Sequence, residues 1–337
     1  MSEAVTGILS RGPASAEVWP MLREGGLLTL SLPQEHGGAG LGAVEVGIVA
    51  RALGEAALAT PFLGTAVAGL VAARSAAGPQ IGEWCKGVAD GDITAVCVRA
   101  AGARELPTFS PDTEIWGVTG TFGAAHHGEQ ARWLLAPTTG GPVLVDLSQP
   151  GFTTTAIETS LATADHAAPH DMYFELSEVA GTPLIAEASD PAALFTDLYR
   201  AVFLAYASGL LNGALRLTAT HLGSRVQFDR PLATFQAASQ EIADIYVLAA
   251  AVESMSLYCD WTLDNGGTPS ADLDAALFLF AGEGRAAMQM CHHLHGGLGV
   301  DVTFPMHRYF SLAKDVVRHC GGERHNLGRL GTRCSSI

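Results

Sequence analysis

The chain has 337 residues and a formal net charge of −15, and its 48% hydrophobic and 16% charged residues are typical of a globular protein. Its 19 Lys and Arg residues are scattered and form no basic stripe, which argues against a nucleic-acid partner. The most apolar stretch, Gly42–Ala73, is interrupted by Glu45, Arg51 and Glu55, so it does not predict a membrane span of about 18 residues. The six cysteines form no CxxC pair, and no secretion signal is recognisable. We expect a cytoplasmic protein that binds neither nucleic acid nor membrane.

Three regions differ in their predicted secondary structure. Residues 1–92 carry mostly helical periodicity. Residues 93–188 contain short apolar runs separated by Gly, Pro and Asp clusters, which predicts strands and turns. Helical periodicity returns in residues 189–337, for example in the spacing of Phe203 and Tyr206. We therefore predict an α+β protein, mostly α, with an N-terminal helical domain, a middle β-domain and a C-terminal helical bundle.

Helix boundaries in the last region are marked by specific residues. Pro231 is expected to close the first long helix, and Thr234 is expected to cap the start of the second. A third helical block, Ala271–Leu294, is expected to end at Gly296 and Gly297.

Three segments carry recognisable motifs. Arg225–Gln236 reads RVQFDRPLATFQ, His293–Asp301 reads HLHGGLGVD, and Gly26–Gly42 reads GLLTLSLPQEHGGAGLG. In this order and spacing they resemble three segments of the acyl-CoA dehydrogenase family, with Asp229 where the family has glycine and His293 where it has glutamine. The resemblance implies the acyl-CoA dehydrogenase-like fold, in which the C-terminal domain is a four-helix bundle.

The resemblance also implies that FAD is the cofactor and lies at an interface, where the Arg225 and glycine segments reach the flavin nucleotide of a neighbouring subunit. Arg225 can donate two parallel hydrogen bonds to a pyrophosphate, which a lysine cannot. Glutamines add neutral hydrogen bonds and phenylalanines an apolar wall, while glycines let the backbone approach a ligand closely. The predicted cofactor-binding residues are Arg225, Gln227, Phe228, Phe235, Gln236, His293, Gly296, Gly297 and Gly299.

The carboxylate that removes the α-proton of the substrate is missing at both positions where the family holds it. Such a base must lie within hydrogen-bonding reach of the proton. The position 21 residues beyond Gly299 holds Cys320, and the position 25 residues before Arg225 holds Arg200. Glu323 is the nearest alternative base, although a solvated loop carboxylate explains it as well. We predict that this chain supplies no catalytic residue.

The residues that the family presents to its own flavin from the β-domain are also absent. The family's TEPxAGSD loop corresponds here to Cys97–Arg104, which reads CVRAAGAR. The tryptophan and threonine that pack on the flavin correspond to Ala124 and His126. The chain therefore keeps what the family presents to a neighbour's flavin and lacks what it presents to its own.

This asymmetry predicts a heteromeric enzyme. The segment Cys291–Asp315 resembles, in particular, the smaller, glutamate-less subunit of the α2β2 acyl-CoA dehydrogenases of actinobacterial steroid degradation, which oxidise cholesterol side-chain CoA thioesters. That resemblance implies an unlike acyl-CoA dehydrogenase subunit as partner, which holds most of the acyl-CoA substrate and carries the catalytic glutamate. It also implies electron transfer flavoprotein as the electron acceptor.

Two other functions and one other site are compatible with the same residues. The chain could form an active homotetramer that uses Glu323 as its base, or it could be a flavin-free scaffold, because fold does not dictate function. Cys291, His292, His293 and His295 invite a metal interpretation, but a closed zinc site requires four ligands and no second cluster has matching spacing. We predict no metal there and assign these histidines to helix-end packing or to the FAD-facing surface.

Overall fold

The computed structural model describes residues 5, 7, 15–75, 79–98, 116–160, 170–184 and 189–334. Its first part is helical, and the Glu45 carboxylate accepts a hydrogen bond from the Gly42 N–H at 3.1 Å where the longest of these helices begins. Pro61 directly precedes the next helix, all of whose residues are buried. The elements are α2 (Ser15–Glu24), η1 (Leu27–Thr29), η2 (Gln34–His36), α3 (Ala43–Glu55), α4 (Phe62–Ala72) and α5 (Pro79–Asp90).

A mixed sheet with the order β1-β3-β4-β6-β2 follows, and β5 pairs with the long strand β6. The pair β1–β3 is parallel and the other pairs are antiparallel. Alternate side chains such as Phe122, Val145 and Phe174 form the core of the sheet. The elements are β1 (Thr94–Val96), β2 (Trp116–Ala125), η3 (Gly128–Gln130), β3 (Trp133–Thr138), β4 (Gly141–Asp146), β5 (Phe152–Ile157) and β6 (Asp171–Pro183).

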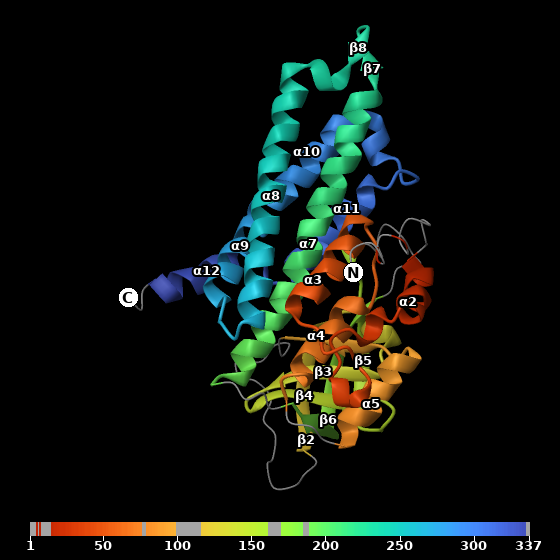
Figure 1. The fold of residues 1–337 in the computed structure, drawn as a ribbon, viewed down its shortest axis with the longest axis vertical. Coiled ribbons are helices and arrows are strands. Elements are labelled where there is room, and N and C mark those ends of the chain that lie inside the picture. The colour runs from red at the N-terminus through yellow and green to blue at the C-terminus, as the bar shows by residue number, and fades with distance from the viewer. Residues whose placement is uncertain are drawn as a thin grey trace.

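The last part is a helical bundle built around α7 (Pro191–Ser224), whose start is capped by the Asp190 carboxylate, 2.9 Å from the Ala193 N–H. In Figure 1, α7 and α8 run side by side away from the sheet, and the β7–β8 hairpin joins them at the far end. The remaining elements are β7 (Val226–Gln227), β8 (Arg230–Pro231), η4 (Leu232–Thr234), α8 (Gln236–Asp264), α9 (Ser270–Leu279), the π-helix η5 (Phe280–Gly284), α10 (Arg285–His295), η6 (Gly296–Val300), α11 (Met306–His319) and α12 (Gly322–Cys334).

One continuous hydrophobic core joins the N-terminal helices to the bundle. Helices α3 and α7 approach each other so closely that a Cβ atom on Gly209 would lie 2.0 Å from the Arg51 carbonyl oxygen. The N-terminal helices therefore brace α7, the helix from which Arg225 extends.

The prediction that Thr234 caps α8 is wrong. The N-cap residue is Phe235, without a side-chain cap, and the Thr234 hydroxyl donates instead to the Pro231 carbonyl at 2.7 Å. The third predicted block forms α9, η5 and α10, and a π-helical segment interrupts it.

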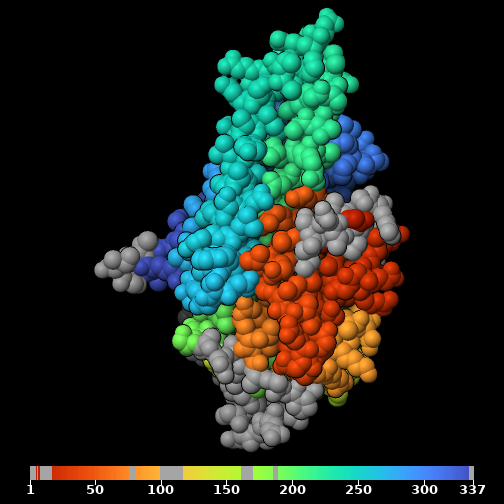
Figure 2. All heavy atoms as spheres, viewed as in Figure 1, coloured from red at the N-terminus to blue at the C-terminus, as the bar shows by residue number. Residues whose placement is uncertain are grey.

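By length and composition alone, α7 and α8 could each cross a membrane. The apolar window of α7 is 89% buried inside the protein, as expected for a core helix, whereas that of α8 is only 28% buried. Tyr246, Val247 and Trp261 lie exposed along α8, and Figure 2 shows this helix running over the surface toward the projecting hairpin. The exposed side of α8 is therefore apolar and uncovered in the isolated chain.

Candidate functional site

The β7–β8 hairpin presents an exposed aromatic residue at the far end of the bundle. Its two central residues, Phe228 and Asp229, have φ angles of 51° and 63°. A two-residue turn with positive φ at both positions matches the twist of a hairpin, and glycine fits it best. A side chain in this region costs about 1–2 kcal/mol, yet Phe228 occupies it while 86% exposed. The Phe235 ring meets Phe228 edge-on, but a side chain this exposed gains little packing energy to offset the strain.

Arg225, the residue that follows α7, is fixed through its backbone. Its N–H donates to His221 O at 2.8 Å, and its carbonyl accepts from Leu232 N at 2.9 Å. The guanidinium is exposed and forms no ion pair within the described part of the chain. It contributes, after burial, to lowering the pKa of His221. Arg225 is therefore held in place but available to an anion from outside the chain.

Two predicted residues of this segment, Phe228 and Phe235, lie together with Arg230, which was not predicted. The Arg230 guanidinium lies 3.9 Å from the centre of the Phe235 ring, and the Phe228 ring meets the same ring edge-on at 6.2 Å. Gln227 and Gln236 are both exposed. The turn thus offers one cation, two amides and an aromatic wall.

The predicted glycine turn follows α10 directly. Gly296 has a φ of 58°, and a Cβ atom on Gly299 would lie 2.7 Å from His292 O, so both positions favour glycine for local reasons. Gly297 differs, because nothing lies within 4 Å of the space that its Cβ would fill. His293 is exposed beside it. The backbone at Gly297 is therefore open to a ligand or another chain.

The structure brings these two segments together. The His221 and His295 rings stack at 4.6 Å, which ties the end of α7 to the end of α10. We call Arg225–Gln236 and His293–Val300 together the tip surface. It carries exposed apolar side chains, including Val226, Phe228 and Val300. His292 Nδ1 and His295 Nδ1 instead contact the backbone oxygens of Gly299 and Cys291 at 2.8 and 2.7 Å, so these two histidines pack the helix end.

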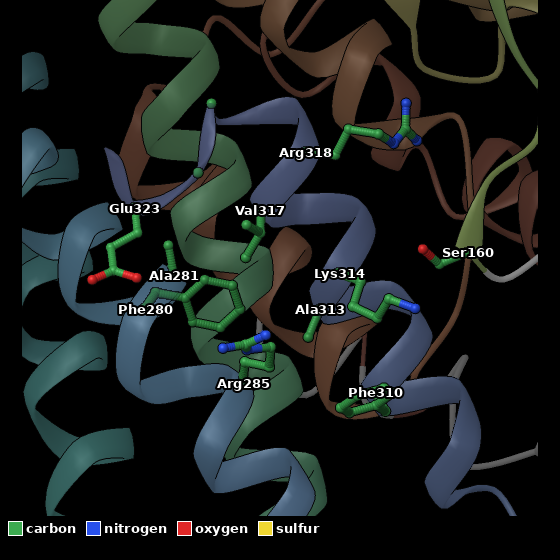
Figure 3. Close-up of a pocket in the computed structure, with 12 residues that line it drawn as sticks. Ser160, Phe280, Ala281, Arg285, Phe310, Ala313, Lys314, Val317, Arg318 and Glu323 are labelled. Carbon is green, nitrogen blue, oxygen red and sulfur yellow. The ribbon is translucent and has the colours of Figure 1, made fainter. Parts of the chain in front are cut away.

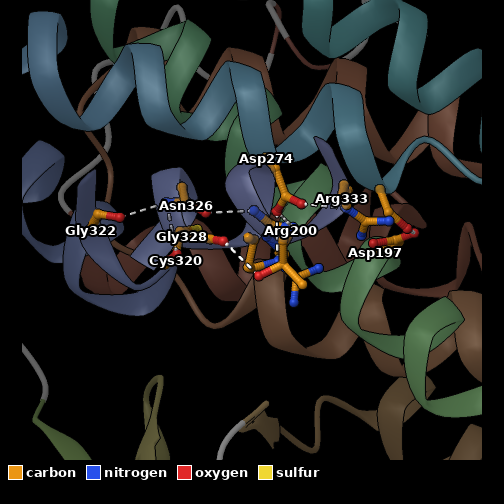
Figure 4. A network of polar contacts seen from close by, with 11 residues as sticks. Asp197, Arg200, Asp274, Cys320, Gly322, Asn326, Gly328 and Arg333 are labelled. Atoms are coloured by element: carbon orange, nitrogen blue, oxygen red, sulfur yellow. Dashed lines mark hydrogen bonds and ion pairs between the residues drawn. The ribbon is translucent and has the colours of Figure 1, made fainter. Parts of the chain in front are cut away.

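The two positions of the missing carboxylate lie in one buried polar network (Figure 4). Arg200 donates to Asn326 Oδ1 at 2.6 Å, and Asn326 Nδ2 donates to Cys320 O at 3.2 Å. Cys320 and Arg200 are both buried. Asn326 therefore links the two substituted positions, and neither offers a carboxylate to a substrate.

Asp274 is the anion that neutralises Arg200. It is fully buried, and its carboxylate contacts Arg200 at 2.5 Å, Arg329 at 2.7 Å and Arg333 at 2.9 Å. Burial alone would raise the pKa of Asp274, but the Arg329 hydrogen bond and the other guanidinium groups hold that pKa below its ordinary value. This carboxylate clamps α12 and α7 onto α9.

His126, at the family's flavin-facing threonine position, lies in a second buried cluster. Its Nδ1 is 3.4 Å from Asp171 Oδ1, and His319 Nε2 is 2.9 Å from Asp171 Oδ2. The ring of His127 meets that of His126 edge-on at 4.3 Å. The adjoining cavity has a volume of about 20 Å³, which is room for about one water molecule. Sequence reasoning singled out His126 alone, because nothing in the sequence relates residues 126, 171 and 319.

Glu323 lines a separate cleft of about 500 Å³ between η5, α11 and the turn before α12 (Figure 3). Phe280 and Phe310 give the cleft apolar walls, and Arg285 and Lys314 give it positive charge. Glu323 itself is exposed. In the compared TEPxAGSD stretch, residues 99–104 lie outside the described part of the chain.

Sequence comparison identifies two family matches. Residues 7–92 match the acyl-CoA dehydrogenase N-terminal domain, and residues 193–322 match the acyl-CoA dehydrogenase C-terminal domain. Acyl-CoA dehydrogenase FadE28 of Mycobacterium tuberculosis is 34% identical over 99% of this chain and 96% of its own length. Acyl-CoA dehydrogenase FadE27 of the same organism is 29% identical, over 94% of this chain and 87% of its own.

Two solved structures of complexes share the fold along the whole chain. A variant of the Tcur3481–Tcur3483 steroid acyl-CoA dehydrogenase superposes with a TM-score of 0.88 at 27% identity, over 99% of this chain and 96% of its own. The ChsE4–ChsE5 complex from Mycobacterium tuberculosis superposes with a TM-score of 0.87 at 25% identity, over 100% and 96%. The predicted fold class is thereby confirmed.

Proposed function

Because the chain belongs to the acyl-CoA dehydrogenase family, we propose that it is the non-catalytic, FAD-site-completing subunit of a heteromeric member of that family. FAD, when bound, accepts the hydride that leaves the β-carbon of a CoA thioester as an α,β double bond forms. The residues of this chain would hold the nucleotide of that FAD from across the interface. The observation that carries the proposal is a contrast between two regions. The tip surface is exposed, whereas the space beside His126, between the β-domain and the bundle, is filled by side chains.

The tip surface fits a nucleotide and a partner chain. An exposed guanidinium at Arg225 and open backbone at Gly297 suit a pyrophosphate. The strain and exposure of Phe228 are those of a side chain that is covered when an interface forms. These groups lie at the end of a rigid bundle, where they can reach into another subunit (Figure 1).

The interior between the β-domain, α7 and α11 does not fit a flavin. His126, at the position of the family's flavin-facing residue, instead contacts Asp171, and the Phe203 ring lies 5.7 and 5.2 Å from those of His126 and His319. The cavity that remains, about 20 Å³, excludes an isoalloxazine ring.

The uncovered side of α8 supports assembly with another subunit. Large exposed side chains recur along it at helical spacing, namely Tyr246, Val247, Leu257, Tyr258 and Trp261. An apolar surface of this kind is typical of a protein–protein interface. We assign it to contacts within an α2β2 assembly.

The comparisons indicate the chemistry of the complex. The Tcur3481–Tcur3483 enzyme is a steroid acyl-CoA dehydrogenase, and ChsE4–ChsE5 is a complex of two named chains. We propose a steroid side-chain acyl-CoA as substrate, held mainly by an unlike acyl-CoA dehydrogenase subunit that also carries the catalytic glutamate. Electron transfer flavoprotein is the acceptor that this chemistry implies.

One observation favours a second function, an active homotetramer with Glu323 as base. Glu323 lines the 500 Å³ cleft beside apolar walls, which a CoA thioester could enter. The exposure of its carboxylate argues against it, because a general base works best where water is excluded.

Replacing Glu323 with glutamine separates the two functions. We expect the complex with Glu323→Gln to turn over at a rate within about twofold of wild type at saturating FAD, because the base belongs to the partner. The matched control is Glu283→Gln, which removes an exposed carboxylate from η5 across the same region. A loss of several orders of magnitude in Glu323→Gln alone would place the base in this chain.

A further inference from the structure

We propose that His126, Asp171 and His319 form a divalent transition-metal site that ties the β-domain to the helical bundle. The three residues come from three elements, namely the turn after β2, the first residue of β6 and the end of α11. One ligand atom from each lies within 4.8 Å of the others. This arrangement does not depend on the tip surface or on the partner subunit.

The spacing of the ligand atoms suits a small tetrahedral cation. Bonds of about 2 Å to a tetrahedral Zn²⁺ place neighbouring ligand atoms roughly 3.3 Å apart. One ligand atom from each of the three side chains lies within 4.8 Å of the others, so small side-chain rotations can bring them around one ion. At present His126 Nδ1 lies 3.4 Å from Asp171 Oδ1 and His319 Nε2 lies 2.9 Å from Asp171 Oδ2, so the two rings face different oxygens of the carboxylate. Two imidazoles and one carboxylate are a donor set that Zn²⁺ and Fe²⁺ both accept.

A supporting residue orients one ligand, and a small cavity leaves room for a fourth. The Tyr199 hydroxyl lies 3.0 Å from His319 Nδ1; when it accepts a hydrogen bond from Nδ1–H, the lone pair of His319 is on Nε2, the nitrogen that faces Asp171. The cavity of about 20 Å³ against His126 and His319 can hold one water as the open-position ligand.

In the structure Asp171 also pairs with the Arg318 guanidinium, and Arg318 has a second carboxylate nearby, that of Asp315. Its guanidinium contacts Asp171 Oδ2 and lies 3.5 Å from Asp315 Oδ1. The Arg318 side chain is about one-third exposed, so it can shift toward Asp315 and solvent when a metal takes Asp171.

The test is Zn²⁺ titration of the metal-stripped complex, with Co²⁺ as the spectroscopic probe. We expect one Zn²⁺ per copy of this chain and Co²⁺ absorption bands of a tetrahedral nitrogen and oxygen site. His126→Ala should lose the site while leaving the Asp171–Arg318 pair in place, and Tyr199→Phe should weaken binding about 10–100-fold. His170→Ala, which removes a partly exposed histidine beside Glu129, is the matched control and should bind as wild type.

FAD content and turnover are measured on the same samples. If the complex has the expected FAD content but shows no saturable Zn²⁺ binding, the metal site is wrong and the proposed function still stands. Equal Zn²⁺ binding by wild type and His126→Ala would overturn the metal site too, because the metal would then lie elsewhere. Loss of binding in His126→Ala at unchanged FAD content supports it.

Discussion

The complex with Arg225→Ala is expected to bind FAD about tenfold or more weakly than wild type. A hydrogen bond to a charged group contributes about 1.5–3 kcal/mol, and each 1.4 kcal/mol is about a factor of ten in affinity. The exposed guanidinium forms no ion pair within the described residues, so its removal breaks nothing inside the chain and the loss reports on the nucleotide. Fluorescence titration of the flavin-free complex with FAD measures it.

Two variants serve as controls for that experiment. Arg225→Lys keeps the charge but cannot form two parallel hydrogen bonds, so we expect an intermediate affinity. Arg216→Ala removes an exposed arginine of α7 that pairs with Glu55 at the end of α3, and should leave FAD binding unchanged. Turnover of Arg225→Ala should recover in excess FAD, because the residue holds the cofactor and moves no proton. If Arg225→Ala binds FAD as tightly as wild type, the nucleotide does not bind at the tip surface.

Asp274→Ala is expected to lower the free energy of unfolding by about 3–5 kcal/mol. The substitution leaves Arg200 buried and charged without its carboxylate, and removes the shared partner of Arg329 and Arg333. Urea denaturation measures the change, with the complex held at the same protein concentration for every variant.

Asp272→Ala is the control for that measurement, because Asp272 is an exposed aspartate two residues earlier in α9. Loss of its favourable position at the helix start should cost only about 0.3–1 kcal/mol. If the two variants unfold at the same urea concentration, the buried ion-pair network does not stabilise the bundle as described.

Much of the fold and part of the site follow from local sequence patterns. The fold class was predictable because helical and strand periodicities extend over long segments. Arg225–Gln236 could be singled out because it is one short segment whose resemblance is readable in the sequence, and its role in cofactor binding stays a prediction. Thr234 was wrongly assigned as a cap because it is the last residue of η4, and α8 begins only after Phe235.

The buried clusters could not be predicted in the same way. Asp274 reaches Arg200 and Arg333 across 74 and 59 positions of the chain, and Asp171 meets His319 across 148. No periodicity connects such pairs, so only the packed structure brings them together. Arg200 was recognisable as a departure from the family, but its counter-ion was not.

The FAD content of the purified complex tests the central claim most directly. We expect this chain to form a tetramer with an unlike acyl-CoA dehydrogenase subunit, with contacts that each bury well over about 1,000 Å². Under the proposed division of roles only the partner has a flavin pocket, so the α2β2 complex should contain two FAD molecules after gentle purification. Four FAD molecules per complex, or a yellow homotetramer of this chain with one FAD per subunit, would contradict the account.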